Sequence, residues 1–492
     1  MDLMQLSPHS RRAFLKRAGQ LALSGTALPM AMNLAALGEA AAAGANDYKA
    51  LVCVFLYGGN DYANTVVTYD EPSYAQYATV RGGAGEAGGG IAIARADLER
   101  TLLKPRTPLA GGRQYALHPS MTGLADLFNA GKAAVQFNVG PLVVPLTRDQ
   151  YNCPDRKTYP LPPKLFSHND QQSIWQSSSP EGSTVGWGGH LGDMAMASNQ
   201  KSLFTCVSVT GNAVFLSGDA ALQYQVSTGG AVRVRGATDG AVYGSAAVKN
   251  LLSSMISQPS SHMLENEYVR ITQRAREAEV HITSALVESQ SGPTGSPLAT
   301  EFPAQNPLAD QLKMVARLIK GRSVLGSKRQ VFLVSLGGFD LHDNLIAQQP
   351  VLLGRVSDAM AAFYKATEEM GLSDSVTSFT ASDFGRTLTS NGDGSDHGWG
   401  GHHVVVGGAV KGQAFYGAPP PVSVGNTGAA QDQWHVGQGR LLPSTSVDQY
   451  AATLARWFGV GAKDMHTILP NLRHFGDMAK RPDYPVNLGF LG

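Results

Sequence analysis

The sequence predicts an α/β protein with a doubly wound, mostly parallel sheet that carries helices on both faces. The first observation is a continuous apolar run at 50–57, which is typical of a strand buried on both sides. The second is that strand-like runs alternate with helical periodicity near both ends of the chain, with no repeat of fixed period. The third is composition, because 492 residues with 43% hydrophobic and 16% charged side chains can bury a large core.

The N-terminal elements follow from local patterns. The run at 50–57 ends in Gly-Gly-Asn-Asp, so we expect a central strand that leads into a loop. A helical stripe begins after the sequence HPSM, with Ser120 as a candidate N-cap and Gly131 as a stop signal. The apolar run at 134–139 predicts the next strand.

The middle of the chain is less regular. Residues 183–247 are rich in Gly, Ser and Val and lack helical periodicity, which predicts an antiparallel insertion or a long decorated loop region. Helical patterns return at 263–289 and 307–322.

The C-terminal third alternates again. We predict strands at 330–336, 375–381 and 403–410, and helices at 351–370 and 446–458. Strands from both ends of the chain therefore contribute to one sheet.

The first 45 residues have the pattern of an export signal. The sequence SRRAFLK at 10–16 is followed by a mildly apolar run at 18–37 and a row of alanines at 40–43. This pattern resembles the twin-arginine signal, which exports folded proteins. We expect a signal peptide at 1–45, one domain at 46–492, and a periplasmic or extracellular product without a membrane span, because no later run reaches about 20 apolar residues.

Charge and cysteine content restrict the classes of function. Lys plus Arg number 39 against 38 Asp plus Glu, and no basic block is present, so we expect no nucleic-acid partner. The chain has three cysteines, Cys53, Cys153 and Cys206, and none has the spacing of a zinc or redox motif. At most one disulfide can form among them, and Cys153 with Cys206 is the plausible pair.

Polar residues follow the predicted strands at the point where each strand ends. The carboxyl ends of parallel strands meet at one edge of a sheet, where ligands bind in open α/β folds. Acidic and imidazole side chains at such an edge are typical ligands for zinc and other divalent ions, calcium and magnesium included. The candidate metal ligands are Asp61, Asp340, His342, Asp383, Asp396, His397 and His402.

Two serines and one arginine are candidates for chemistry on a substrate. Ser120 opens a predicted helix, and Ser167 lies in the densely polar segment LFSHNDQQ, where it could equally cap a helix. Arg386 follows the same strand as Asp383 and could hold an anionic group with two hydrogen bonds, or form a surface ion pair.

Several motifs, taken in order, resemble one bacterial family, that of domain of unknown function 1501. They are FLYGGND, HPSM, FSHNDQQ, SLGGFDLH, SDFGRT with SDHGWGGHH, and the closing SVDQYAATLARWFG. The resemblance covers essentially the whole chain. It implies an alkaline-phosphatase-like and sulfatase-like fold, divalent metals at the carboxyl ends of the sheet, and transfer of phosphoryl or sulfuryl groups by a Ser or Thr nucleophile.

The superfamily pattern transfers to this chain only in part. It matches Asp61 loosely, because two glycines intervene after the strand, and it leaves Ser120 and Ser167 as rival nucleophiles. Asp340 and His342 match a pair with closer spacing than usual, while Phe384 stands where the pattern has His after Asp383. A last ligand is available from the histidines of SDHGWGGHH, namely His397, His402 or His403.

Two functions remain open at this stage. The first is an exported metal-dependent hydrolase of phosphate or sulfate esters, acting on a small anionic or glycan-like substrate. The second is a non-catalytic exported protein on the same fold that binds a glycan or a partner, since the resemblance also implies a co-exported protein partner.

Overall fold

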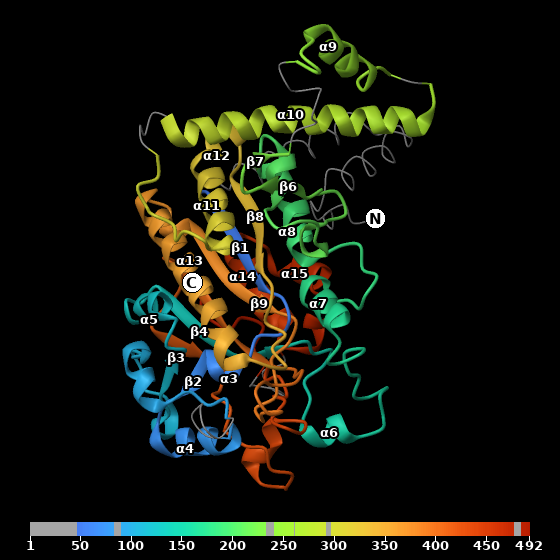
Figure 1. Ribbon diagram of the computed structural model, residues 1–492. Helices are drawn as coiled ribbons and strands as arrows, with labels where there is room; N and C mark the ends of the chain where they lie inside the picture. The colour runs from blue at the N-terminus through green and yellow to red at the C-terminus, as the bar shows by residue number, and fades with distance from the viewer. Residues whose placement is uncertain (1–46, 83–89, 233–240, 260, 292–296, 477–483) are drawn as a thin grey trace.

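The computed structural model describes residues 47–82, 90–232, 241–259, 261–291, 297–476 and 484–492 (Figure 1). The predicted signal at 1–45 lies outside the described residues. The strands are β1 (Lys49–Leu56), β2 (Val66–Thr68), β3 (Tyr115–Leu117), β4 (Ala133–Gly140), β5 (Cys206–Ser208), β6 (Tyr224–Ser227), β7 (Gly230–Ala231), β8 (Arg329–Leu336), β9 (Val376–Ser382), β10 (Gly401–Gly407), β11 (Ala414–Tyr416) and β12 (Thr445–Ser446). The helices are α3 (Tyr62–Thr65), α4 (Glu71–Val80), α5 (Thr122–Asn129), α6 (Arg148–Asn152), α7 (His168–Ser177), α8 (Trp187–Ala195), α9 (Ala246–Met255), α10 (Met263–Ser291), α11 (Pro307–Lys320), α12 (Arg322–Leu325), α13 (Leu345–Glu369), α14 (Val447–Phe458) and α15 (Ala462–Ile468).

One large sheet organises the molecule. Within the described residues it has ten strands in the order β11-β4-β10-β9-β1-β8-β5-β6-β7, with β12 beside β4. The central strand β1 is parallel to both β8 and β9, in registers that pair Leu56 with Leu336 and with Ser382. Strand β10 runs antiparallel between β9 and β4. The expected α/β fold with a mostly parallel sheet is confirmed.

Helices cover both faces of the sheet, because alternate residues of the buried strands point in opposite directions. Ala50, Val52 and Val54 of β1 lie in the core that packs against α5, α11 and α13. Leu51 and Cys53 belong to the core on the other face, beneath α8 and α14. This arrangement explains the uninterrupted apolar run of β1.

Several local predictions need correction. Ser120 does not cap α5, whose N-cap is Met121 without a side-chain hydrogen bond. Helix α13 starts six residues before the predicted start and includes Pro350 in its second turn. The segment 183–247 contains helix α8, and its strands β5 and β6 extend the sheet in parallel. Glycines inside α8 concealed its periodicity, since they replace the apolar side chains that mark a helix face.

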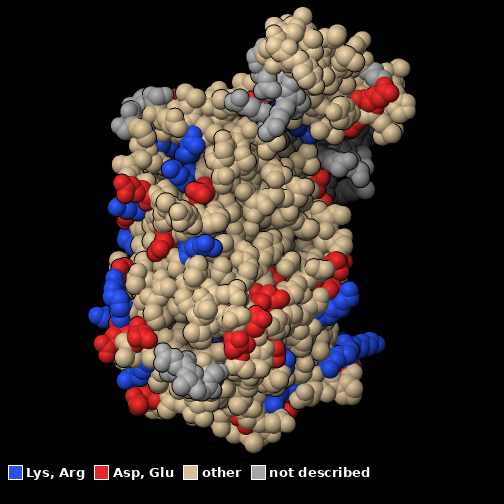
Figure 2. Space-filling model, viewed as in Figure 1, with Lys and Arg blue, Asp and Glu red and all other residues tan. Residues whose placement is uncertain are grey.

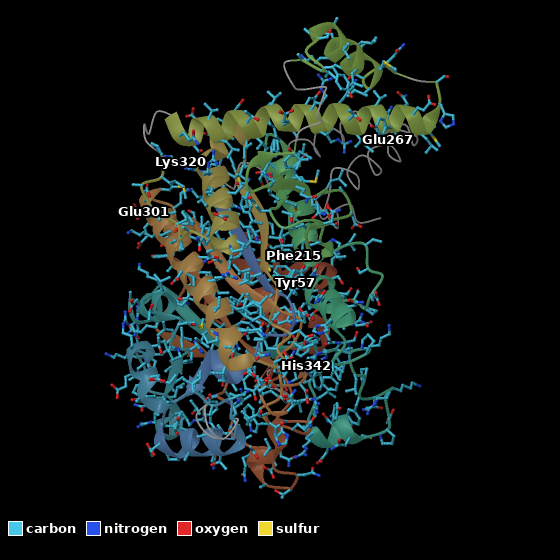
Figure 3. All side chains as sticks on the ribbon, viewed as in Figure 1. Tyr57, Phe215, Glu267, Glu301, Lys320 and His342 are labelled. Carbon is cyan, nitrogen blue, oxygen red and sulfur yellow. The ribbon has the colours of Figure 1, made fainter. Side chains whose placement is uncertain are left out.

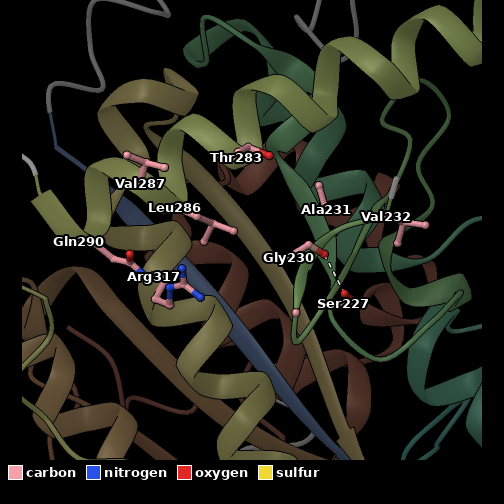
Figure 4. Close-up of a pocket in the computed structure, with 10 residues that line it drawn as sticks. Ser227, Gly230, Ala231, Val232, Thr283, Leu286, Val287, Gln290 and Arg317 are labelled. Atoms are coloured by element: carbon pink, nitrogen blue, oxygen red, sulfur yellow. Dashed lines mark hydrogen bonds between the residues drawn. The ribbon is translucent and has the colours of Figure 1, made fainter. Parts of the chain in front are cut away.

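The long helix α10 crosses the end of the molecule where the parallel strands begin (Figure 1). Its C-terminal half packs on α11, α12 and β7. A hollow of about 610 Å³ lies beside this half, and Figure 4 shows Thr283 and Leu286 of α10 around it together with Gly230 and Arg317. The N-terminal half of α10 extends beyond the sheet, with α9 next to it.

The cysteines are free thiols in this structure, so the plausible disulfide between Cys153 and Cys206 does not form. Cys53 and Cys206 are buried, and burial raises the pKa of each thiol. Among the described residues no helix is both long enough and apolar enough to cross a bilayer. On the face seen in Figure 2, basic and acidic side chains are interspersed without one large basic area.

Candidate metal centre

The loops that follow β1, β8 and β9 meet at one edge of the sheet, because these neighbouring strands are parallel. Figure 3 shows His342 among these loops, beyond the carboxyl ends of the strands. Gly58 allows their close approach: its φ is +115°, and a Cβ there would lie 2.3 Å from the amide nitrogen of Asp340.

Three imidazoles and one carboxylate converge in this place. The Nε2 atom of His397 lies 3.1 Å from Nε2 of His168 and 2.9 Å from Nε2 of His342. The carboxylate of Asp340 lies 3.2 Å from Nε2 of His397, 3.3 Å from Nε2 of His168 and 3.1 Å from Nε2 of His342. Four donor groups from three separate segments of the chain therefore face one another.

The other ring nitrogen of each histidine already has an acceptor. Nδ1 of His168 lies 2.7 Å from the Asp383 carboxylate, Nδ1 of His342 lies 3.2 Å from Asp396, and Nδ1 of His397 lies 2.8 Å from the carbonyl oxygen of Phe166. A neutral imidazole has one N–H, so these contacts place the proton on Nδ1 and leave a lone pair on every Nε2 atom. Lone pairs at about 3 Å repel one another unless a cation lies among them.

The donor set therefore fits a divalent cation. Zinc bonds to imidazole nitrogen at about 2.0–2.1 Å, and tetrahedral bonds of this length place neighbouring donors about 3.3 Å apart. The separations between donor atoms in contact are 2.9–3.3 Å, close to this value. Donor atoms of His168, Asp340 and His397 all lie within 4.8 Å of one another, whereas His342 joins this group through its contacts with His397 and Asp340. Carboxylates or carbonyls on the Nδ1 side are the usual partners of metal-bound histidines.

Asp383 is fully buried and orients His168. One carboxylate oxygen, Oδ2, accepts from His168, from the side-chain amide of Gln172 at 2.8 Å and from the backbone N–H of Gly58 at 3.1 Å. The other, Oδ1, has no hydrogen-bond partner although it is buried. This unpaired oxygen is a further potential ligand atom beside the imidazoles.

Burial and hydrogen bonds shift the pKa values of this group. The hydrogen bond that His168 donates to Asp383 raises the pKa of His168, whereas burial lowers the pKa of His397. Burial opposes ionisation of Asp340, but the hydrogen bond from Arg386 together with the charges of Arg386, His168 and His342 outweighs it and holds the pKa of this carboxyl below its ordinary value. The carboxylate of Asp340 is therefore charged at neutral pH.

Some predicted site residues join this group and others do not. Asp340, His342, Asp383, Asp396 and His397 come together as described. Asp61 instead accepts two hydrogen bonds from the buried guanidinium of Arg81, at 2.8 and 2.9 Å. His402 is buried between the rings of Tyr62 and Phe137, and burial lowers its pKa to about 3. We assign Asp61 and His402 to the framework of the fold.

The two candidate nucleophiles lie in different surroundings. The Ser120 hydroxyl is 2.8 Å from Nδ1 of His118, in a hollow of about 900 Å³ that also contains Asn344, and no contact joins it to the three imidazoles within the described residues. Ser167 immediately precedes His168 and donates to the carboxylate of Asp170 at 2.9 Å. Ser167 is therefore the candidate adjacent to the metal centre.

Arg386 does not face a substrate site, because its side chain is buried and both terminal nitrogens of its guanidinium donate to groups of the protein. Its guanidinium donates to Asp340 at 2.6 Å and to the carbonyl oxygens of Gly58 and Ser395. Arg440 is the more accessible cation. Its Nε donates to the carbonyl oxygen of His397 at 2.7 Å, and within the described residues no hydrogen bond reaches its two terminal nitrogens.

Sequence reasoning missed His168 as a ligand and Arg440 as a cation. Phe384 stands where the superfamily pattern has a histidine, and its ring packs beside the His168 and His397 rings, 4.9 and 4.7 Å from their centres. His168 reaches the same carboxylate from helix α7 instead. The sequence feature that could have identified His168 is the polar segment LFSHNDQQ, which contains this histidine next to Ser167.

A second group of possible ligands, His190, Asp193 and Asp219, has a simpler explanation. The Asp193 carboxylate accepts hydrogen bonds from the backbone N–H groups of Asp219, Ala220 and Ala221 at 2.6–2.8 Å. These bonds fasten the 219–221 turn to α8 and use the carboxylate oxygens that a cation would need.

Comparison with known proteins places the chain in a family. The model of the family described as "protein of unknown function (DUF1501)" matches residues 48–469. The chain belongs to the DUF1501 family. The expected family membership of this DUF1501 protein is thus confirmed, and no curated protein matches it significantly.

Solved structures resemble the DUF1501 protein at low identity. One is described as "Ps i-CgsB in complex with k-i-k-neocarrahexaose", with 10% identity, 90% of this chain and 78% of that chain covered, and a TM-score of 0.35. Another is the PsFucS1 sulfatase from Pseudoalteromonas sp., with 10% identity, coverage of 87% and 72%, and a TM-score of 0.34. A third, BT33494S-sulf of Bacteroides thetaiotaomicron, is 11% identical with coverage of 85% and 74% and a TM-score of 0.32. Likeness at this level carries no argument about function.

Proposed function

We propose that this DUF1501 protein is an exported metal-dependent hydrolase of sulfate or phosphate esters that acts on an anionic or glycan-like substrate. The observation that carries the proposal is the convergence of three Nε2 lone pairs on the Asp340 carboxylate. A cation is the group that such an arrangement stabilises, and open metal sites at strand ends are suited to ester hydrolysis.

His168, His342, His397 and Asp340 would hold the metal. Asp383 and Asp396 orient two of the imidazoles from behind, and Arg386 fixes the Asp340 carboxylate. When bound, a zinc ion supplies positive charge that polarises the ester group. The side chains of Asp340 and His342 are 43% and 45% exposed, so a substrate can approach from this side.

Ser167 and Arg440 would act on the substrate itself. Ser167 donates its proton to Asp170, and its oxygen forms the new bond to sulfur or phosphorus while the ester oxygen leaves and takes a proton from solvent. Water then releases the sulfate or phosphate and restores the hydroxyl. The free terminal nitrogens of Arg440 would bind the anionic oxygens of the substrate.

The first test measures zinc binding. Titration of the metal-free protein by calorimetry should give one site, and His168→Ala or His397→Ala should weaken it at least about 100-fold, since each removes a ligand. His190→Ala is the matched control. His190 lies beside Asp193, whose carboxylate is occupied by hydrogen bonds from backbone N–H groups, so its removal should leave zinc binding unchanged. Equal affinity in all variants would refute the assignment of the ligands.

The second test measures hydrolysis of 4-nitrophenyl sulfate and 4-nitrophenyl phosphate. Ser167→Ala should abolish turnover with zinc binding unchanged, whereas Arg440→Gln should mainly raise KM. If zinc binds stoichiometrically without hydrolysis of either ester, the second candidate is favoured, a non-catalytic binding protein. The observation in its favour is the Arg386 guanidinium, which already neutralises the Asp340 carboxylate.

A further inference from the structure

The N-terminal half of α10 carries an apolar stripe that no other described part of the chain covers. Leu264, Tyr268 and Ile271 are 69%, 62% and 53% exposed. Single exposed apolar residues are ordinary, but these three follow one another at intervals of four and three residues and so share one face of the helix. The end of the helix that carries them extends past the sheet (Figure 1).

The same spacing continues along the whole helix. The stripe runs on through Ala275 to Ala278, Ile282, Ala285 and Ser289, always at intervals of three or four. Where α10 lies on the body of the protein these last four residues are at most 2% exposed. The C-terminal half therefore uses the stripe for packing within the chain. The N-terminal half presents larger side chains on the same face, and these are exposed in the part of the chain that the structure describes. Strict alternation of three and four residues is the pattern by which two helices pack side by side.

Helix α9 does not cover this stripe. The segment after α9 contacts α10 through Ser257, whose carbonyl oxygen accepts from Gln273 and whose hydroxyl accepts from Arg276. Gln273 and Arg276 lie on another side of the helix, since neither belongs to the three-and-four series. The contact with Ser257 therefore does not cover Leu264, Tyr268 or Ile271.

Charges beside the stripe favour a second copy of the same helix in the opposite direction. In an antiparallel pair with Tyr268 opposite Ile271, Leu264 lies opposite Ala275, and Glu267 of one copy lies beside Arg274 of the other. The acidic residues Glu265 and Glu267 are near the free end of the helix, where Figure 3 labels Glu267 and Figure 2 shows acidic side chains together. The basic residues Arg270 and Arg274 follow, so acidic and basic ends match when the helices are reversed. Within one copy Glu267 forms an exposed ion pair with Arg270 at 3.5 Å.

We propose that this stripe is a homodimer interface in which the N-terminal halves of two α10 helices pack antiparallel. The interface is smaller than the standard size of stable complexes, so the dimer is weak, with a dissociation constant in roughly the micromolar range. Glu267 beside the stripe and His342 lie at opposite ends of the molecule (Figure 3), so the proposed contact is remote from the metal centre of each copy.

Sedimentation velocity over a range of concentrations tests the proposal on the protein without its predicted signal. The protein should pass from monomer to dimer, and Tyr268→Glu should weaken dimerisation at least about tenfold, because it places a charge in the stripe. Val280→Glu is the matched control. Val280 is equally apolar and 61% exposed on the same helix, but it lies outside the stripe, and its replacement should leave the dimer unchanged.

Charge reversal distinguishes a second copy from any other partner. Glu267→Arg and Arg274→Glu should each weaken the dimer, and the double variant should restore it, because the antiparallel pair then has the same contacts with signs exchanged. Circular dichroism confirms that each variant is folded. A protein that stays monomeric, a dimer insensitive to Tyr268→Glu, or a double variant without recovery would each overturn the proposal. So would a monomer whose stripe binds phosphatidylglycerol vesicles in flotation assays, since the partner would then be a membrane.

Discussion

At the scale of single residues, an acidic side chain at a strand end serves either a ligand site or the framework, and its partners decide which. Asp340 faces three imidazole lone pairs, whereas Asp61 faces the guanidinium of Arg81. The Asp61 carboxylate also accepts from the hydroxyl of Ser395 at 2.6 Å and from the backbone N–H of Asn64 at 3.0 Å. All its oxygens are thus committed to the fold.

This difference predicts opposite effects of two substitutions. Asp61→Asn leaves the Arg81 charge buried and unpaired, so unfolding in urea should show a loss of about 3–5 kcal/mol, while the zinc affinity of the folded protein stays unchanged. The double variant with Asp61→Asn and Arg81→Met should lose less free energy of unfolding than Asp61→Asn alone, because no unpaired charge then remains buried. Loss of zinc binding without loss of stability would instead make Asp61 a ligand.

At the scale of elements, the loops after β1, β8 and β9 approach so closely that glycine is required at specific positions. Gly58 has both a positive φ and no room for a side chain, because Asp340 lies directly against it. Gly337, in the loop after β8, has no atom within 4 Å of its hypothetical Cβ. A side chain would therefore clash with the backbone at Gly58, whereas there is room for one at Gly337.

Gly58→Ala should move the β8 loop away from β1 and Asp340 with it. We expect a loss of stability of about 1–3 kcal/mol and weaker zinc binding, measured by urea unfolding and by calorimetry. Gly337→Ala is the control and should change neither quantity appreciably. Equal effects of the two substitutions would contradict the close approach of the loops.

At the scale of the whole molecule, stability depends on pH through a buried carboxyl in the core. Asp448, in the first turn of α14, is 1% exposed, its Oδ1 has no hydrogen-bond partner, and burial raises the pKa of its carboxyl to about 7 from 3.8. The folded protein thus binds a proton at Asp448 that the unfolded chain releases near pH 4. This contribution to stability is complete below about pH 4 and is lost as the pH rises through 7.

Asp448→Asn should remove that dependence, because the amide does not titrate. The free energy of unfolding of the wild-type protein should fall relative to that of the variant between pH 4 and 7, by on the order of 4 kcal/mol. Denaturation in urea at several pH values measures the difference. Glu301→Gln removes an exposed carboxyl and should follow the wild-type protein. If the free energies of unfolding of Asp448→Asn and of the wild-type protein changed with pH in the same way, the Asp448 carboxyl would be ionised in the folded protein.

The sequence by itself determined the main strands and helices at the two ends of the chain and the edge of the sheet where the polar residues gather, but not helix α8 or strands β5 and β6. Apolar runs longer than a turn, such as that of β1, have few alternatives to a buried strand, and strand direction then brings Asp340, His342 and Asp383 to one edge. The helix predicted at 446–458 corresponds to α14, which Ser446 begins with a capping box.

The tertiary structure alone decided which polar residues face one another. His168 is more than 200 residues from Asp383 in the chain, and its role depends on how α7 packs beside β9 rather than on any local pattern. Asp61 pairs with Arg81 in the interior, and the buried guanidinium of Arg386 pairs with the half-exposed carboxylate of Asp340, because a buried charge must find a partner within reach. Local sequence encodes periodicity and turns, whereas the choice of partners among charged side chains is made only when distant segments exclude water together.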